Sequence, residues 1–435
     1  MLETLNRPLV EVAKVRHYYG KPDPGRTPVL DDVNLTLREN EIVGLLGRSG
    51  SGKSTLLRSI AGLIRPSEGQ VDFPPDPEGG PATSVAMVFQ SFALFPWLTV
   101  EQNVELGLEA QRVPPAERRR RALAAIDLIG LDGFENAYPK ELSGGMRQRV
   151  GLARALVVNP SILLMDEPFS ALDVLTAETL RTDLLDLWGE GRMPIKSILI
   201  VTHNIEEAVL MCDRILVFSS NPGRVAAEIR VDLPQPRNRQ APAFRAMVED
   251  IYARMTVRVG PSPVGDGLFP GMGIGMALPE VSTNTLAGML EAIASPHFNG
   301  RASLRALADE AVLEADELFP TAETLQLLRF AELDGGDIRL TASGRRYVAA
   351  EVDDRKQLFA QHLIGYCPLA GHIRKVLEER PGNSAPARRF RDELEDHMSD
   401  DYAEQTLKTV IDWGRYAEVF AYHEDTDRFS LDDPG

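Results

Sequence analysis

The stretch Gly47-Arg48-Ser49-Gly50-Ser51-Gly52-Lys53-Ser54-Thr55 decides the fold of this chain. It fits the pattern G-x-x-x-x-G-K-[ST], in which glycines let the backbone wrap closely around a phosphate. An apolar run at residues 42–46 precedes it, and a helix-like run at 55–61 follows it. We therefore predict a strand, a phosphate-binding loop and a helix whose N-terminus faces an anion, rather than an ordinary glycine-rich turn.

The residue types of this loop match the needs of phosphate binding. Lys53 would reach the β- and γ-phosphates of a nucleotide, and the Ser54 hydroxyl would bind Mg²⁺. The dipole of the following helix adds about half a positive charge at its N-terminus. The residues that we expect to contact the nucleotide here are Gly47, Ser49, Gly50, Gly52, Lys53, Ser54 and Thr55.

A second set of motifs follows later in the chain. Residues 142–149, LSGGMRQR, are typical of a Gly-Gly turn that opens a helix, which gives a second phosphate-facing helix N-terminus. The apolar run at 161–165 ends in Asp166-Glu167-Pro168, as in a buried strand that carries two carboxylates. Two further polar residues directly follow apolar runs: Gln90 follows residues 85–89, and His203 follows residues 198–202. A third, Asp173, ends the motif Ser170-Ala171-Leu172-Asp173.

In this order, the motifs resemble those of the nucleotide-binding subunit of ATP-binding cassette (ABC) transporters. The resemblance covers about residues 8–258 and implies an ATPase that binds ATP and Mg²⁺. It also implies an α/β P-loop core at about 8–88 and 160–258, with a helical subdomain at about 91–158. We accordingly predict a nucleotide-binding domain at residues 1–258.

Phosphoryl transfer to water needs charge neutralisation, in-line positioning and a polarised water molecule. Asp166 would hold Mg²⁺ through water, together with Ser54. Glu167 would act as general base or orient the water, the alternative being a structural carboxylate at a strand end. The resemblance implies that His203 contacts the γ-phosphate and that Gln90 senses both Mg²⁺ and the attacking water. With Lys53, these residues form the predicted catalytic set.

The adenine ring needs a contact of its own. Tyr19, just before Gly20, stands where the family stacks an aromatic side chain on adenine. Tyr18 is adjacent, so the assignment can shift by one residue. The alternative is a surface aromatic residue on a short strand.

The resemblance implies that the signature residues complete the site of a second cassette. Ser143, Gly144 and Gly145, with Asp173, would face the ATP held by the phosphate loop of a partner. The chain has one phosphate loop and one signature, so it cannot close a two-site sandwich alone. We expect a dimer with a second copy or with a related ATP-binding subunit.

Length and composition fit a peripheral subunit. The 435 residues suggest two to three domains, and no run of 18 uninterrupted apolar residues occurs. The N-terminus lacks the features of a signal peptide, and Cys212 and Cys367 form no metal or redox motif, as is typical of the cytoplasm. A transport cassette of this kind would use separate integral-membrane permease subunits at the cytoplasmic face of the membrane.

Two segments are candidates for contact with a permease. Residues 91–100, SFALFPWLTV, are aromatic-rich and interrupted by proline, and in the family this region receives a helix of the permease. The alternative is internal packing between the two lobes. Residues 138–141 resemble the segment that transmits docking between subunits.

The chain continues beyond the cassette. Residues 259–280 are rich in glycine and proline and indicate a linker. Residues 281–435 predict a mostly helical domain. Its helical patterns at 303–308 and 324–333 lead into a short strand at 335–341, and those at 390–394 and 403–411 lead into another at 428–431. This order resembles a tandem winged-helix arrangement.

The charge of residues 281–435 argues against nucleic-acid binding. They hold 29 Asp and Glu against 17 Lys and Arg, a net charge of −12 out of −17 for the chain. Such a surface lacks the cations that drive duplex binding. The segment resembles the extra C-terminal AAA-associated domain of some nitrate, sulfonate and taurine cassettes. Regulation of the ATPase is our hypothesis, and passive dimer scaffolding is the alternative.

The residues around 201–208 and 218–224 look most like importer cassettes for nitrate, sulfonates, taurine or bicarbonate. An importer of that class would also work with a solute-binding protein. The cargo itself is not fixed by these residues, because selectivity lies in the permease and the binding protein. The alternatives are a non-transport ABC ATPase and a nucleotide-dependent regulator.

Overall fold

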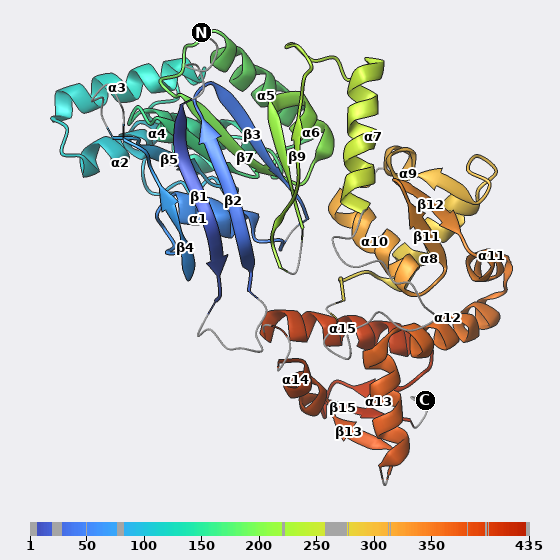
Figure 1. Ribbon diagram of the computed structural model, residues 1–435. Coiled ribbons are helices and arrows are strands. Elements are labelled where there is room, and N and C mark those ends of the chain that lie inside the picture. Colours follow the sequence, from blue (N-terminus) through green and yellow to red (C-terminus); the bar gives the residue numbers. More distant parts are fainter. Residues whose placement is uncertain are drawn as a thin grey trace. The chain divides into compact units, whose positions relative to one another are not determined.

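A computed structural model divides the chain into two compact units (Figure 1). The structure describes residues 7–19, 28–48, 50–75, 82–219, 222–256, 276, 278–311, 313, 315–380, 382–395, 398 and 400–431. Unit 1 takes in the described residues up to Val248, and unit 2 takes in those from Glu249 on. The domain boundaries drawn from the sequence at 258 and 280 stay predictions.

A six-stranded sheet forms the centre of unit 1. Its strands, in spatial order, are β5 (Val85–Val88), β6 (Ile162–Asp166), β7 (Ser197–Thr202), β3 (Glu41–Leu46), β8 (Arg214–Phe218) and β9 (Val225–Arg230). The first five are parallel, and β9 is antiparallel to β8. Every residue of β3, β6, β7 and β8 is buried, as expected for parallel strands that are covered on both faces.

A second, antiparallel sheet packs against the first. Its strands, in spatial order, are β2 (Leu30–Arg38), β1 (Pro8–His17) and β4 (Glu68–Asp72). Apolar residues of β1 and β2, such as Val12 and Val33, share one core with Leu45 of β3 and Leu56 of α1 (Lys53–Ile60). Burial of this apolar surface fixes the start of α1 between the two sheets.

The remaining helices of unit 1 are α2 (Val100–Ala110), α3 (Pro115–Leu128), α4 (Gly144–Leu156), α5 (Val174–Gly189), α6 (Ile205–Met211) and the start of α7 (Pro242–Thr256), with the 3-10 turn η2 (Pro139–Glu141). Helices α2, α3 and α4 pack on one another. They form the helical lobe expected near residues 91–158, and Figure 1 shows them in cyan and green.

Unit 2 contains the same small fold twice. The first copy runs through α8 (Thr283–Ala294), β10 (Arg301–Ser303), α9 (Leu304–Ala311), α10 (Ala315–Leu327), β11 (Ala331–Asp334) and β12 (Asp337–Leu340). The second runs through α13 (Pro368–Glu379), β13 (Ser384–Pro386), α14 (Ala387–Glu395), α15 (Asp400–Tyr416), β14 (Ala421–His423) and β15 (Arg428–Ser430). The sheet orders, β10-β12-β11 and β13-β15-β14, correspond strand for strand. The tandem winged-helix-like fold is confirmed.

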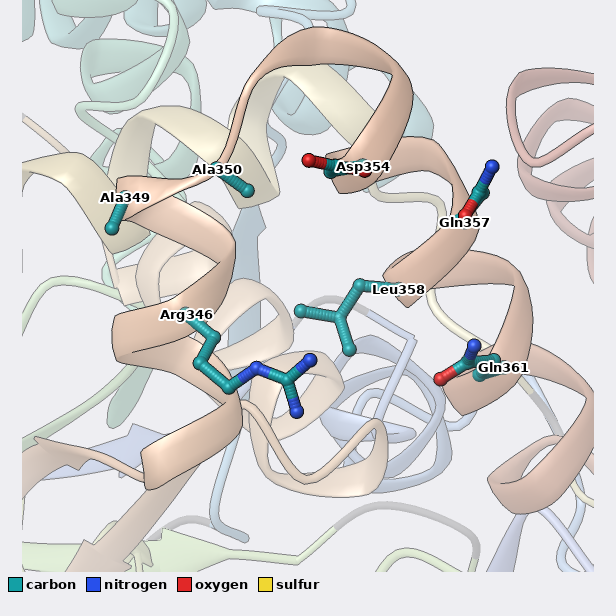
Figure 2. A pocket seen from close by; sticks show the side chains of 7 residues that line it. All are labelled: Arg346, Ala349, Ala350, Asp354, Gln357, Leu358 and Gln361. Carbon is teal, nitrogen blue, oxygen red and sulfur yellow. The ribbon is translucent and has the colours of Figure 1, made fainter.

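Two helices join the copies. They are α11 (Ala342–Ala349) and α12 (Val352–Tyr366), and the corner between them is seen from close by in Figure 2. Helix α11 packs on α8 and β12, whereas α12 packs on α13 and α15. The corner therefore lies where the first copy meets the second.

One helix of this region ends earlier than the sequence pattern predicts. The pattern indicates a helix at 324–333, but α10 ends at Leu327 and Arg329 adopts a left-handed conformation, with φ of 59°. Residues 331–334 instead pair with β12 as strand β11. Phe330 and Ala331 are buried, and a short apolar run fits a buried helix as well as a buried strand, so apolar periodicity alone could not distinguish the two.

The predicted linker lies mostly outside the described residues. Of residues 259–280, the structure describes 276 and 278–280. Leu278 is buried, and its backbone N–H donates to Thr406 Oγ1 at 3.2 Å, so packing against α15 begins before residue 281. None of the helices in the described part of the chain has the length and apolar character needed to span a membrane.

Candidate active site

The phosphate loop connects β3 to α1 and is shaped by glycine. Gly50 and Gly52 have φ of 75° and 91°, which side chains rarely tolerate. A Cβ at Gly47 would lie 2.8 Å from the carbonyl oxygen of Phe218, and one at Gly52 would lie 2.7 Å from Leu30 Cδ2. Larger residues therefore do not fit without displacing the neighbouring strands. Ser49 lies outside the described residues.

The polar groups of this loop suit an anion. Lys53 is buried, and its Nζ donates to the carbonyl oxygens of Gly47 and Arg48, each at 2.6 Å. The Ser51 Oγ is buried without a hydrogen-bond partner among the described residues. The N–H groups in the first turn of a helix have no hydrogen-bond partners within that helix. Together with the ammonium group of Lys53, those of α1 fit a bound polyphosphate.

Two oxygen ligands for a hard cation lie beside the loop. The Ser54 Oγ donates to Asp166 Oδ1 at 2.7 Å, which joins the start of α1 to the end of β6. Burial raises the pKa of Asp166. The described residues contain no group of three or more His, Cys, Asp or Glu side chains that could hold a metal ion. Mg²⁺ typically binds one or two protein oxygens and completes its shell with water and substrate phosphates, so the pair fits it.

Glu167 lies at the centre of a polar cluster. Its Oε2 is 3.3 Å from His203 Nδ1 and accepts a hydrogen bond from Gln90 Nε2 at 3.1 Å. Gln90 Nε2 also lies 3.3 Å from Ser170 Oγ. The close contact with His203 lowers the pKa of Glu167, against the effect of burial. The carboxylate is therefore held ionised next to the phosphate loop.

The backbone conformation of Glu167 could not be foreseen from the sequence. Its φ is 44°, in the left-handed region, and its N–H donates to Val201 O at 3.1 Å. A non-glycine residue in this region costs about 1–3 kcal/mol, and such strain is typical of functional sites. The bond to β7 holds Glu167 near His203, because His203 directly follows that strand. Gln90, predicted to sense the metal, has its hydrogen bonds to Glu167 and Ser170, and its metal contact stays a prediction.

Tyr19 lies against the first turn of α1. Its hydroxyl is 3.1 Å from Thr55 Oγ1, and its ring makes an edge contact with His17 at 4.9 Å between centroids. About half of the Tyr19 side chain is exposed (49%), which leaves a ring face open for stacking. Tyr18 instead bonds Ser67 through its backbone N–H. The adenine contact of Tyr19 stays a prediction.

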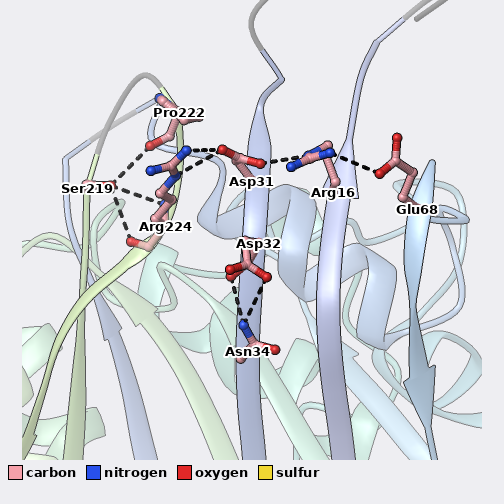
Figure 3. Close-up of polar contacts among 8 residues, drawn as sticks. All are labelled: Arg16, Asp31, Asp32, Asn34, Glu68, Ser219, Pro222 and Arg224. Atoms are coloured by element: carbon pink, nitrogen blue, oxygen red, sulfur yellow. Dashed lines mark hydrogen bonds and ion pairs between the residues drawn. The ribbon is translucent and has the colours of Figure 1, made fainter.

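A buried carboxylate next to the loop was not foreseen from the sequence. Asp31 of β2 accepts hydrogen bonds from Arg16 Nε at 2.7 Å and Arg224 Nε at 3.0 Å, and Arg16 extends the chain to Glu68 (Figure 3). Burial acts to raise the pKa of Asp31, but the two arginines lower it overall. Next to Arg224, a Cβ at Gly223 would lie 2.2 Å from the carbonyl oxygen of Ser51. The network thus supports the outer side of the phosphate loop.

The signature residues form a second group. Ser143 caps α4 by accepting from Met146 N at 3.3 Å, and Asp173 caps α5 by accepting from Thr176 N at 3.0 Å. Hydrogen bonds from Thr176 lower the pKa of Asp173. A Cβ at Gly145 would lie 2.2 Å from Thr176 Cγ2, so the two helix starts adjoin.

The two groups begin helices that pack on different elements. Helix α1 packs on β6 and β7, whereas α4 packs on α2, α3, α5 and β5. The fold thus gathers the phosphate loop with Asp166, Glu167, Gln90 and His203, and it gathers Ser143, Gly144 and Gly145 with Asp173.

The predicted docking segment is exposed and firmly held. Trp97 is 68% exposed and Phe95 42% exposed, with their rings 5.4 Å apart. The buried Asn103 side chain bonds the backbone of Phe95, Leu98 and Thr99. On the other side, Arg154 of α4 donates to the carbonyl oxygens of Phe92, at 2.9 Å, and Ala93. The segment is thereby linked to the helix that begins with the signature.

Tyr138, in the segment predicted to transmit docking between subunits, is also exposed. Its backbone N–H donates to Glu141 Oε2 at 2.7 Å, which closes the turn η2 directly before the signature. This contact fixes the entry of the chain into α4.

Comparison with known proteins agrees with this geometry. The family model described as "ABC transporter" matches residues 30–170, and the model described as "C-terminal AAA-associated domain" matches residues 305–423. An uncharacterized ABC transporter ATP-binding protein of Methanocaldococcus jannaschii is 45% identical over 219 residues, which cover 50% of this chain and 81% of that protein.

Two other relatives have names that state a cargo. The nitrate import ATP-binding protein NrtD of Synechocystis sp. is 46% identical over 219 residues, with 49% of this chain and 81% of that protein covered. The taurine import ATP-binding protein TauB of Pseudomonas putida is 43% identical over 228 residues, with 52% and 84% covered. The chain belongs to the ATP-binding subunits of ABC transporters: it is an ATPase whose ligands are ATP and Mg²⁺, and it carries a C-terminal AAA-associated domain.

Proposed function

We propose that this chain powers the import of a small solute, of the nitrate, sulfonate, taurine or bicarbonate type, through separate permease subunits. The observation that carries the proposal is its similarity, along the whole cassette, to proteins named for nitrate and taurine import. The exposed pair Phe95 and Trp97, anchored to the signature helix, supports it as a surface for a permease. Such a subunit works at the cytoplasmic face of the membrane.

The residues of the site divide the work of hydrolysis. Lys53 and the N-terminus of α1 hold the phosphates, and Tyr19 stacks on the base. Mg²⁺, held by Ser54 and Asp166, supplies neutralisation of phosphate charge. Glu167 takes a proton from the attacking water or orients it.

The hydrogen bonds around Glu167 suit this role. His203 and Gln90 both hold its Oε2, so Oε1 is left to face the water. Because the carboxylate is ionised, it can accept a hydrogen bond from the attacking water and orient it. We infer from the resemblance that His203, which lies beside Glu167, contacts the γ-phosphate.

The separate packing of the signature supports a dimer. Ser143, Gly144 and Gly145 open helix α4, whose first turn is capped by Ser143 and adjoins the start of α5. We infer that this turn binds the ATP of a second ATP-binding subunit, either another copy or a related chain. Asp173 caps the adjoining helix and would support the same interface.

The negative charge of the C-terminal segment disfavours nucleic-acid binding, which leaves regulation as the better proposal for unit 2. Its two winged-helix-like copies belong to a segment with net charge −12. We propose that it regulates the ATPase, with passive scaffolding of the dimer as the alternative.

The test of the mechanism is Glu167→Gln in the full chain. We expect ATP hydrolysis to fall by about 10²- to 10⁴-fold, because the water loses its base, while ATP binding persists. Size-exclusion chromatography with Mg-ATP should then show a stable dimer. The matched control is Glu190→Gln, at an exposed residue paired only with Arg192 among the described residues, and it should leave hydrolysis unchanged.

The test of the transport role is what the chain binds in its own cell. We expect wild-type chain isolated from membranes to retain integral-membrane permease subunits, identified by mass spectrometry. Retention of nucleic acid or ribosomal proteins without a permease would favour a non-transport ABC ATPase and contradict the proposal.

A further inference from the structure

A hollow of about 380 Å³ lies at the corner between α11 and α12 (Figure 2). Helix α11 contributes Arg346 and Ala349, and α12 contributes Asp354, Leu358 and the two glutamines 357 and 361. Ala350, between the helices, completes the lining. The volume is at the lower end of the range for small-molecule sites, so only a small ligand fits.

The polar side chains of this hollow are not used by the fold. Arg346, Asp354, Gln357 and Gln361 make no hydrogen bond or ion pair with any residue that the structure describes. Elsewhere in unit 2 such groups are commonly paired: Arg301 with Asp337, Arg355 with Glu291, Arg374 with Glu378, and Arg389 with Glu393. The hollow thus collects charged and amide groups whose bonding capacity is left for a ligand or solvent.

The walls of the hollow are held rigidly from behind. Arg355 of α12 donates to the carbonyl oxygens of Val348 and Ala350, at 2.8 and 2.9 Å, and pairs with Glu291 of α8. Its guanidinium lies over the ring of the buried Tyr347. One side chain thus ties α12 to the end of α11 and to α8, which holds the corner between the two helices.

The placement of charge selects the class of ligand. Figure 2 shows the Arg346 guanidinium and the Asp354 carboxylate on either side of Leu358, whose side chain is buried at the floor. A guanidinium fork matches a carboxylate or sulfonate, and a carboxylate matches an ammonium group. A plain anion would meet the like charge of Asp354, and a plain cation that of Arg346. An apolar floor between two opposite charges fits a short hydrocarbon spacer.

We propose that this hollow binds a small zwitterion, an ω-amino sulfonate or ω-amino carboxylate. Its acidic group bonds Arg346, its ammonium bonds Asp354, and its methylene spacer lies on Leu358 and Ala349. Gln357 and Gln361 supply further hydrogen bonds along the same wall. The bound ligand links α11, which packs on the first winged-helix-like copy, to α12, which packs on the second.

Binding to this hollow is a property of unit 2 alone. Its consequence, control of the ATPase by the state of the corner, rests on the proposed function. The experiment is therefore chosen to measure binding without ATP, so that a failure of the proposed function leaves its result intact.

The test is isothermal titration calorimetry of the full chain with taurine, β-alanine and 4-aminobutyrate. Ethanesulfonate serves as the anion without an ammonium group. We expect at least one zwitterion to bind, and ethanesulfonate to bind more weakly. Arg346→Gln and Asp354→Asn should each weaken the zwitterion by about tenfold or more, since each removes a charge-assisted hydrogen bond.

Matched controls use an exposed pair of the same unit. Arg388→Gln and Asp392→Asn make the same chemical changes on α14, where the two residues pair with each other. They should leave zwitterion affinity unchanged, and thermal melting should show all four variants folded. Since Arg346 and Asp354 are exposed and unpaired, we expect no loss of stability from their replacement.

Three results would overturn the proposal. One is the absence of measurable binding of any of the three zwitterions. Another is equal affinity for ethanesulfonate and taurine, with Asp354→Asn tightening both, which would make the hollow a simple anion site. The third is an equal loss of zwitterion affinity in the test variants at Arg346 and Asp354 and in the control variants at Arg388 and Asp392. That result would place the binding site elsewhere.

Discussion

Replacing Asn103 by alanine should loosen the exposed aromatic segment and spare the nucleotide site. The Asn103 side chain is fully buried at the start of α2. Its Oδ1 accepts from Phe95 N at 2.8 Å, and its Nδ2 donates to the carbonyl oxygens of Phe95, Leu98 and Thr99 at 3.2, 3.1 and 2.9 Å. One side chain thus supplies four contacts that hold the loop carrying Trp97.

The free-energy cost of Asn103→Ala depends on which backbone groups lose their hydrogen-bond partners. The carbonyl oxygens of Phe95 and Thr99 keep backbone bonds from Leu98 N and Asn103 N. The N–H of Phe95 and the carbonyl of Leu98 lose the contacts described above. An unsatisfied buried polar group costs about 1–3 kcal/mol. Water reaches part of this segment, because Phe95 is 42% exposed, so we expect a loss of about 2–3 kcal/mol for the pair.

The assay is amide hydrogen exchange of the full chain, read by mass spectrometry on peptides that cover residues 92–103. A loss of about 2–3 kcal/mol in local opening corresponds to about 30- to 150-fold faster exchange. Local exchange is preferred to a melting curve, since a chain of two units need not unfold in one step. ATP binding should be unchanged.

The control is Asn34→Ala, an exposed asparagine whose side chain bonds Lys14 N and Asp32 in the same unit. It should leave exchange at residues 92–103 unaltered. The reasoning is refuted if Asn103→Ala leaves that exchange within about threefold of the wild type, because the two orphaned groups would then cost almost nothing.

Three further outcomes are expected. Trp97→Glu should abolish co-purification with the membrane permease and keep ATP binding. Leu63→Glu, at another exposed apolar residue, should keep both. If Trp97→Glu still retains the permease at the wild-type level, this segment is excluded as the docking site. The lowered pKa of Asp31 adds stability that is present above its unfolded pKa of about 4 and is lost as pH falls through the folded value. In denaturant titrations, the difference in unfolding free energy between wild type and Asp31→Asn should therefore narrow on acidification. A difference that stays constant would count against an ionised Asp31. A variant that ends after residue 261 should hydrolyse Mg-ATP at a different rate from the full chain if unit 2 regulates it, and equal rates with and without permease would favour scaffolding.

The sequence by itself determined the cassette. The glycines of the phosphate loop, the apolar runs before it and before Asp166 and His203, and the signature turn are all local patterns. A glycine is required where the backbone must adopt a left-handed conformation or approach a neighbour closely, as at Gly52. The requirement can be seen in the sequence because it concerns a single residue. Buried parallel strands likewise reveal themselves as short apolar runs. Family, ATPase activity and ligands could therefore be predicted before any contact was known.

Only the tertiary structure decided which distant polar groups meet. Asp31 pairs with Arg224 across 193 positions of sequence, and Gln90 reaches Glu167 across 77. With 64 acidic and 47 basic side chains in the chain, composition cannot choose among the possible pairs. The left-handed Glu167 was missed for the same reason, because its N–H bonds Val201 of β7. The end of α10 at Leu327 is instead tied to the local hairpin that residues 331–334 form with β12.

The hollow between α11 and α12 shows the same division. Helical periodicity marks neither Arg346 nor Asp354 as special, since both look like solvated surface charges. Their place on either side of Leu358 depends on the angle of the corner, which Arg355 fixes by bonding carbonyl groups of α11 and a carboxylate of α8. Sequence determines what each short segment prefers to be, because those preferences act over a few residues. Packing decides which side chains face one another, because that depends on all the segments at once.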